Sequence, residues 1–75
     1  MIRIGLNGAA GRMGKRISSL IKNDKELKLC LALEHDKHSE LGKDMGALNG
    51  EGSMGVNLTS QFVNDKLDSL IDFSH

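Results

Sequence analysis

Three glycines spaced three residues apart near the N-terminus restrict the fold of this chain more than any other feature. They lie within residues 7–16, NGAAGRMGKR. Residues 2–7, IRIGLN, alternate apolar and other side chains as a strand does, and the apolar residues between Arg12 and Lys22 recur at helical spacing. The three glycines therefore stand at a turn from a strand to a helix.

A glycine turn in this setting is typical of nucleotide-binding folds. One glycine makes the tight turn, a second lets the backbone approach a pyrophosphate, and a third lets the helix pack on the strand. Gly8, Gly11 and Gly14 follow the pattern GxxGxxG, a variant of the usual GxGxxG. The alternative interpretation is an ordinary glycine-rich turn.

Positive charge gathers where the predicted helix begins. Arg12, Lys15 and Arg16 occupy its first turns, where each cation costs roughly a few tenths of a kcal/mol against the helix dipole. A bound diphosphate would reverse that cost, so we expect one at this helix start. Otherwise the three cations are solvated surface.

The second predicted strand, residues 27–34, LKLCLALE, ends in an acidic residue. Apart from its first exposed position it is apolar on both faces, as strands of parallel sheets covered by helices are. Glu34 lies 20 residues after Gly14, where a dinucleotide fold carries the carboxylate that binds the adenosine ribose. An ordinary carboxylate at a strand end is the alternative.

The rest of the chain continues the alternation of elements. Residues 35–55 hold five of the nine glycines and predict a long loop, with one helical turn at 39–41. A short strand at 56–60, one or two helical turns at 61–67 and a strand at 69–74 follow. The order βαβ, loop, β, short α, β predicts an α/β fold with an open parallel sheet.

Composition excludes several classes of partner. Ten cationic and ten acidic side chains give a formal net charge of zero, and two Phe with no Trp or Tyr leave little to stack on bases, so we expect no nucleic acid. No apolar run approaches the ~18 residues of a membrane helix and no signal peptide is apparent, so we expect a cytoplasmic chain without a membrane partner. We expect Cys30 to be a buried small hydrophobe and no metal site to be present.

Three stretches together resemble the N-terminal domain of the dihydrodipicolinate reductase family. They are IRIGLNGAAGRMG, LALE followed by LGKDMGALNG, and LIDFS, in that order along the chain. The resemblance implies a truncated Rossmann-like cofactor domain at 1–75, in a larger homotetrameric NAD(P)H-dependent oxidoreductase with a separate substrate domain. That enzyme reduces the product of dihydrodipicolinate synthase, a small molecule, to tetrahydrodipicolinate in lysine and diaminopimelate biosynthesis. Its catalytic residues lie in the substrate domain, so the resemblance implies no catalytic residue here and an inactive chain.

The resemblance also assigns cofactor-binding positions. Matched to the pyrophosphate-contacting turn are Gly8, Ala9, Ala10, Gly11, Arg12 and Met13. Glu34 matches the ribose ligand, and His35 stands where many members carry an arginine that binds the 2′-phosphate of NADPH. The cofactor is therefore NADH or NADPH, and His35 favours NADH or dual use.

Two alternatives stay open at this point. One is the cofactor domain of another amino-acid-pathway dehydrogenase, although the stretch LGKDMGALNG argues against it. The other is a non-catalytic dinucleotide-sensing module.

The C-terminal end of the chain carries two further expectations. Asp72 either caps a turn or lines a crevice at the carboxyl edge of the sheet. The chain stops at His75 with no closing helix, so we expect a truncated domain whose last strand is uncovered and which is marginally folded.

Overall fold

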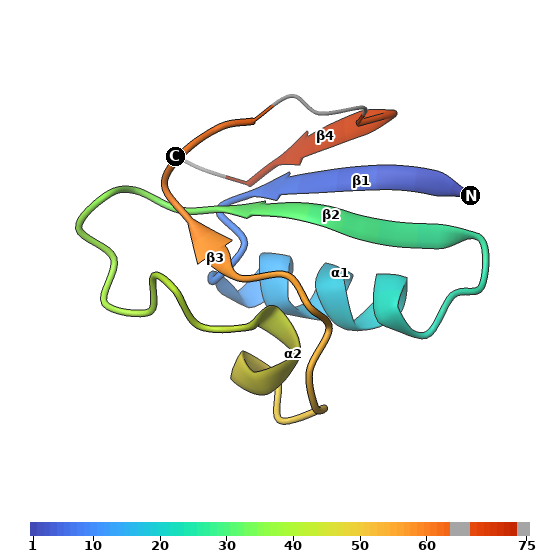
Figure 1. Ribbon diagram of the computed structural model, residues 1–75, viewed down its shortest axis with the longest axis horizontal. Helices are drawn as coiled ribbons and strands as arrows, with labels where there is room; N and C mark the ends of the chain where they lie inside the picture. The colour runs from blue at the N-terminus through green and yellow to red at the C-terminus, as the bar shows by residue number, and fades with distance from the viewer. Residues whose placement is uncertain (64–66, 74–75) are drawn as a thin grey trace.

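The computed structural model describes residues 1–63 and 67–73, which form a parallel sheet with helices on one side (Figure 1). The strands are β1 (Ile2–Asn7), β2 (Leu27–Leu33), β3 (Leu58–Thr59) and β4 (Ser69–Asp72), and the helices are α1 (Arg12–Lys22) and α2 (Met45–Leu48). The strands lie in the order β3-β2-β1-β4, and every neighbouring pair is parallel. The predicted α/β class with an open parallel sheet is confirmed.

β1 lies inside the sheet, with β2 on one side and β4 on the other. The chain leaves β1 through α1 to β2, continues to β3, and then returns past β1 to β4 (Figure 1). Open α/β sheets bind ligands where the strand order reverses in this way, outside the carboxyl ends of the strands. We therefore expect a ligand to bind near the carboxyl ends of β1 and β4.

α1 has the predicted bounds. Gly11 is its N-cap, in an extended conformation with φ −73° and ψ 174°. At the other end Asn23 is the C-cap, and its side-chain Nδ2 donates a hydrogen bond of 2.9 Å to the carbonyl oxygen of Ser19.

The buried face of α1 differs from the predicted one. Gly14, Ser18 and Ile21 are buried, whereas Met13 and Leu20 are 49% and 62% exposed. Of the apolar residues at helical spacing, Ile21 is buried and Ile17 packs against the core, so the predicted apolar face is confirmed only in part. The small residues Gly14 and Ser18 complete the buried face. Ser18 is fully buried and its Oγ donates to the carbonyl oxygen of Lys15 at 2.9 Å.

The core lies between the sheet and the two helices. Its buried members are Ile4, Leu6, Ala9, Ile21, Leu29, Ala32, Met45 and Leu58. Gly5 faces the opposite side of β1, where an added Cβ would lie 2.9 Å from Leu67 and 3.0 Å from Leu70. β4 contains no buried residue, and Leu70 is 43% exposed. Of the apolar residues in β4, Ile71 packs against the core and Leu70 lies on the exposed side, so the expectation of an uncovered last strand holds for one face of the described residues.

Cys30 occupies an irregularity in the sheet. Ile4 pairs with Leu29 and Gly5 pairs with Leu31, so Cys30 is the extra residue of a bulge. Its side chain is half-buried rather than buried, which corrects the predicted interior position. The bulge explains the difference, because a residue without a ladder partner is turned partly out of the sheet.

Residues 44–57, which overlap the long loop predicted at 35–55, form a compact segment around one carboxylate, and residues 39–41 form a turn without the expected helix. The half-buried Asp44 side chain caps α2, a helix absent from the prediction, and accepts hydrogen bonds from both ends of the segment. The donors are the amides of Gly46, Ala47, Met54, Gly55 and Val56, at 2.8–3.2 Å, and the Ser53 hydroxyl, at 3.3 Å. The bonds from Met54 and the other amides lower the pKa of Asp44 from 3.8 to about 2.

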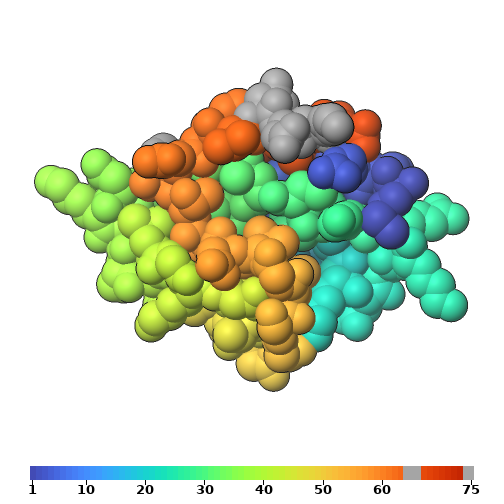
Figure 2. Space-filling view, viewed as in Figure 1, coloured from blue at the N-terminus to red at the C-terminus, as the bar shows by residue number. Residues whose placement is uncertain are grey.

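The same segment is fastened to α1. Asn49 Nδ2 donates to the Lys15 carbonyl oxygen at 3.1 Å and to Ser18 Oγ at 2.9 Å, and Ser19 Oγ donates to Glu51 Oε2 at 2.7 Å. In the space-filling view the segment, coloured yellow to orange, forms one continuous surface beside the cyan residues of α1 (Figure 2). These three hydrogen bonds attach the 44–57 segment to α1 and so fix the position of the helix.

The C-terminal part departs from prediction in detail. β3 is shorter than the expected 56–60, although Asn57 forms an isolated bridge to Asp44. Residues 61–63 and 67 are not helical, so the helical turns expected over 61–67 are not found there, and 64–66 lie outside the described residues. Ser74 and His75, at the end of the expected last strand, also lie outside them. Within 1–63 and 67–73, no helix is long and apolar enough to cross a membrane.

Candidate functional site

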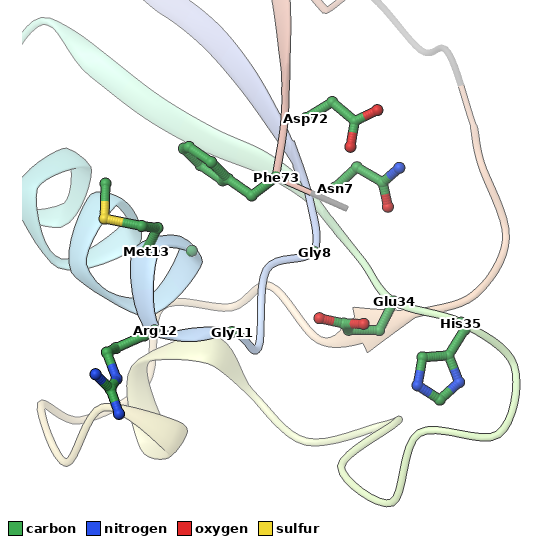
Figure 3. Close-up of a pocket in the computed structure, with 10 residues that line it drawn as sticks. Asn7, Gly8, Gly11, Arg12, Met13, Glu34, His35, Asp72 and Phe73 are labelled. Carbon is green, nitrogen blue, oxygen red and sulfur yellow. The ribbon is translucent and has the colours of Figure 1, made fainter. Parts of the chain in front are cut away.

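An open groove of about 850 Å³ lies at the carboxyl edge of the sheet (Figure 3). Its walls come from the ends of β1 and β4, the glycine turn, the first turn of α1 and the residues after β2. The lining residues are Asn7, Gly8, Gly11, Arg12, Met13, Gly14, Glu34, His35, Asp72 and Phe73. The groove therefore sits where the strand order reverses.

A separate structural feature explains why each of the three positions in the motif is a glycine. Gly8 has φ +79°, a left-handed conformation that favours glycine at the end of β1. An added Cβ at Gly11 would lie 3.3 Å from the Gly8 carbonyl oxygen, and one at Gly14 would lie 2.5 Å from both the Gly8 and the Ala9 carbonyl oxygens. The turn and the helix start are packed backbone against backbone, as the motif predicts.

The amides of the turn are engaged within the protein. Those of Gly8 and Ala9 both donate to the Leu33 carbonyl oxygen at 3.0 Å, and that of Gly11 donates to the Gly8 carbonyl oxygen at 3.1 Å. The Ala10 amide donates to Glu34 Oε2 at 3.1 Å. These amides hold the turn on the end of β2 and are not directed at a ligand.

The next amides along the chain are different. In the described part of the chain, the amides of Arg12, Met13 and Gly14 have no hydrogen-bond acceptor. They are the first N–H groups of α1, which carries no acidic residue in its first turn and no side-chain cap. Such a helix start offers N–H groups and positive potential to an anion.

The three cations near this helix start do not act together. Arg12 is exposed and lines the groove. Lys15 is half-buried and is not among the groove residues. Arg16 is exposed and is not among the groove residues. Of the three, Arg12 is placed to meet an anion in the groove.

Glu34 follows β2 directly and lies between two elements. Its amide donates to the Thr59 carbonyl oxygen at 2.9 Å, beside β3, and its side chain reaches the glycine turn at Ala10. Figure 3 shows the carboxylate directed toward the turn, while the imidazole of His35 points away from it. Glu34 is half-buried and lines the groove.

His35 stands at the exposed rim of the groove. Its ring lies edge-on to that of His38, with centroids 5.4 Å apart. His38 Nδ1 accepts a hydrogen bond of 3.0 Å from the Glu40 amide, and Glu40 pairs with Lys43 at 2.7 Å. The His35 ring is thus supported by a structured loop.

The structure brings most of the predicted site residues together. Groove residues that the sequence predicts are Gly8, Gly11, Arg12, Met13, Glu34 and His35. Ala9 is fully buried in the core and Ala10 packs half-buried against it, so neither lines the groove. Asn7, Gly14, Asp72 and Phe73 line it in addition. For Asp72 this is one of the two alternatives that the sequence offered, a crevice position at the carboxyl edge of the sheet.

Metal binding has no support from the residues that can be placed. Within 1–63 and 67–73 no group of three or more His, Cys, Asp or Glu side chains is arranged to hold an ion. The charged side chains that line the groove are Arg12, Glu34 and Asp72, and the His35 imidazole lies beside them. This mixed set suits a ligand with both phosphate and hydroxyl groups better than a bare cation.

Comparisons with known proteins agree with this geometry. The family model described as "Dihydrodipicolinate reductase, N-terminus" matches residues 2–75. A 4-hydroxy-tetrahydrodipicolinate reductase of Syntrophotalea carbinolica is 43% identical over 99% of this chain, and one of Methanocaldococcus jannaschii is 36% identical over 99%. The chain spans 28% and 29% of the lengths of these two relatives. This chain therefore belongs to the dihydrodipicolinate reductase family, of which it represents the N-terminal, Rossmann-like region.

Proposed function

We propose that this chain is the NAD(P)H-binding portion of a cytoplasmic, homotetrameric reductase. The reductase would convert the product of dihydrodipicolinate synthase to tetrahydrodipicolinate in lysine and diaminopimelate biosynthesis. The chain supplies only the cofactor groove, and no residue in it is assigned a catalytic role. We expect residues 1–75 alone to bind the dinucleotide only weakly and to catalyse no turnover.

The observation that carries this proposal is the set of unsatisfied amides at the start of α1. The N–H groups of Arg12, Met13 and Gly14 have no acceptor in the described residues, and Arg12 lines the same groove. A diphosphate would provide the acceptors and the negative charge that this helix end requires. Arg12, Met13 and Gly14 are better placed to bind the diphosphate than residues 8–11, because the amides of that turn already donate hydrogen bonds within the protein.

The remaining groove residues fit the two ends of a dinucleotide. Glu34, after β2, is placed to accept hydrogen bonds from the adenosine ribose hydroxyls. Asp72, the last residue of β4, and Phe73, which follows it, lie across the groove from Glu34 (Figure 3). We place the nicotinamide half of the dinucleotide on their side of the groove. A bound nicotinamide would supply the hydride for the reduction, and the groove residues would hold the dinucleotide.

His35 decides the proposed cofactor preference. An arginine in this position would pair permanently with the 2′-phosphate of NADPH, whereas an imidazole is only partly charged at neutral pH. His35 is exposed and supported by His38, without a second cation lining this part of the groove. We therefore expect NADH to bind at least as tightly as NADPH.

Calorimetric titration of the chain with NADH and NADPH tests the proposal. Arg12→Ala should weaken the binding of both ligands about tenfold or more. This is the loss of affinity expected when one hydrogen bond to a charged group is removed. Arg16→Ala is the matched control, because it removes the same charge from the same helix outside the groove. No binding by the folded chain, or equal losses in the two variants, would count against the proposed site.

A further inference from the structure

The side chain of Glu34 connects a strand end to the glycine turn before any ligand is present. Its Oε2 accepts a hydrogen bond of 3.1 Å from the Ala10 amide, which lies 24 positions earlier in the chain. The Glu34 backbone is itself fixed, because its amide donates to the Thr59 carbonyl oxygen at 2.9 Å. The carboxylate is therefore a link between the β2–β3 edge and the turn.

Ala10 is the turn residue for which this link matters. The amides of Gly8 and Ala9 are held by the Leu33 carbonyl oxygen, and that of Gly11 by the Gly8 carbonyl oxygen. Only the Ala10 amide depends on a side chain, and Ala10 comes immediately before the N-cap of α1. Its position sets the direction in which the chain enters the helix.

We propose that Glu34 is a positioning residue for the diphosphate, in addition to any contact with the ribose. Through the bond to Ala10 it holds the turn so that the amides of Arg12, Met13 and Gly14 face the groove. This inference rests on the proposed function of the groove. The two carboxylate oxygens of Glu34 then have different roles: Oε2 holds the turn through Ala10, and Oε1 is left to bind a ribose hydroxyl.

Electrostatics and positioning make opposite predictions for a ligand that lacks a ribose. A carboxylate beside an anion site repels a phosphate, so removing its charge should strengthen the binding of inorganic pyrophosphate if repulsion alone operates. If Glu34 positions the turn, removing the acceptor oxygen should weaken the binding of pyrophosphate. The sign of the change separates the two roles.

The test compares the wild-type chain with Glu34→Gln and Glu34→Ala by calorimetry with inorganic pyrophosphate. Gln keeps an acceptor oxygen for Ala10 and should bind pyrophosphate at least as tightly as the wild type. Ala should bind it about fivefold to tenfold more weakly, the loss expected for one hydrogen bond of this kind. Asp36→Ala is the control, because it removes an exposed carboxylate two positions away that does not line the groove. Unchanged or tighter binding by Glu34→Ala would overturn the inference.

A second readout uses no ligand and keeps the inference separate from the proposed function. Hydrogen exchange of the Ala10 amide should be slow in the wild type and in Glu34→Gln, and fast in Glu34→Ala. Equal exchange in all three folded proteins would overturn the positioning role. Wild-type chain that shows the Ala10 protection but binds neither NADH nor pyrophosphate would refute the proposed function and, with it, the role in diphosphate binding.

Discussion

Gly14 of α1 packs against the backbone of Ala9, and a Cβ added at Gly14 would lie 2.5 Å from the Ala9 carbonyl oxygen. Real Cβ atoms do not approach a backbone oxygen so closely, so either the helix or the turn must move to admit one. Gly14 also lines the groove, where its own amide has no acceptor in the described ranges. One glycine therefore brings the helix start close to the strand end and keeps the groove open.

Gly14→Ala should destabilise the chain and weaken NADH binding together. We expect a loss of about 1–3 kcal/mol in the free energy of unfolding, the usual cost of overpacking a tight contact. Urea unfolding followed by circular dichroism measures it. Gly11→Ala is the comparison, because its added Cβ would meet the Gly8 carbonyl oxygen at 3.3 Å and should cost less. Equal stability of the two variants would contradict this explanation.

Asn49→Ala tests the attachment of the 44–57 segment to α1. The substitution removes two hydrogen bonds and leaves the fully buried Ser18 hydroxyl without the Asn49 donor. The expected loss is about 1–3 kcal/mol in the free energy of unfolding, measured in urea. Asn57→Ala, which truncates an exposed amide side chain on the same segment, should have little effect. A loss no larger than that of Asn57→Ala would show that the attachment contributes nothing.

Asp44 should make the stability of the chain depend on pH in the acid range. Its pKa is about 2 in the folded chain and 3.8 ordinarily, so the folded state binds the proton less readily than the unfolded state. The stabilisation is therefore fully present above about pH 4 and is lost as the pH falls from about 4 to about 2. Thermal unfolding of the wild type and Asp44→Asn should show a Tm difference that narrows over this interval. A constant difference from pH 6 to pH 2 would contradict the assignment.

His35→Arg should shift the cofactor preference toward NADPH. An arginine at the groove rim can form a charge-assisted pair with the 2′-phosphate, and we expect NADPH to bind about tenfold more tightly. NADH serves as the control ligand, since it lacks that phosphate and should bind as before. Calorimetry with both ligands measures the ratio. If the ratio of the NADPH and NADH affinities does not change, the 2′-phosphate of bound NADPH does not lie next to residue 35.

Elements with a strong local pattern were predictable from the sequence. β1 and α1 have the predicted bounds, and β2 ends at Leu33, one residue before the predicted end. These elements have regular alternation or helical spacing of apolar residues. The positions of Glu34 and His35 in the groove followed from the same pattern, because the end of a parallel strand next to β1 must lie at the carboxyl edge.

Features that depend on distant contacts were not predictable. α2 has only four residues, and its N-cap is held by amides of residues 54–56, ten to twelve positions away. The burial of Ser18 in the packed face of α1 depends on its small size and cannot be read from hydrophobicity, whereas the close packing of Gly14 followed from the glycine motif. The bond between Ala10 and Glu34 spans 24 positions and leaves no local signature.

The central claim is that the diphosphate of a pyridine dinucleotide binds the first amides of α1. A titration of ¹⁵N-labelled chain with NADH, followed by amide chemical shifts, tests this most directly. We predict saturable shifts concentrated at Arg12, Met13 and Gly14, with smaller changes at Glu34 and none at Leu29 in the core of β2. Absence of saturable shifts at those three amides, or binding that perturbs residues away from the groove, would contradict the account.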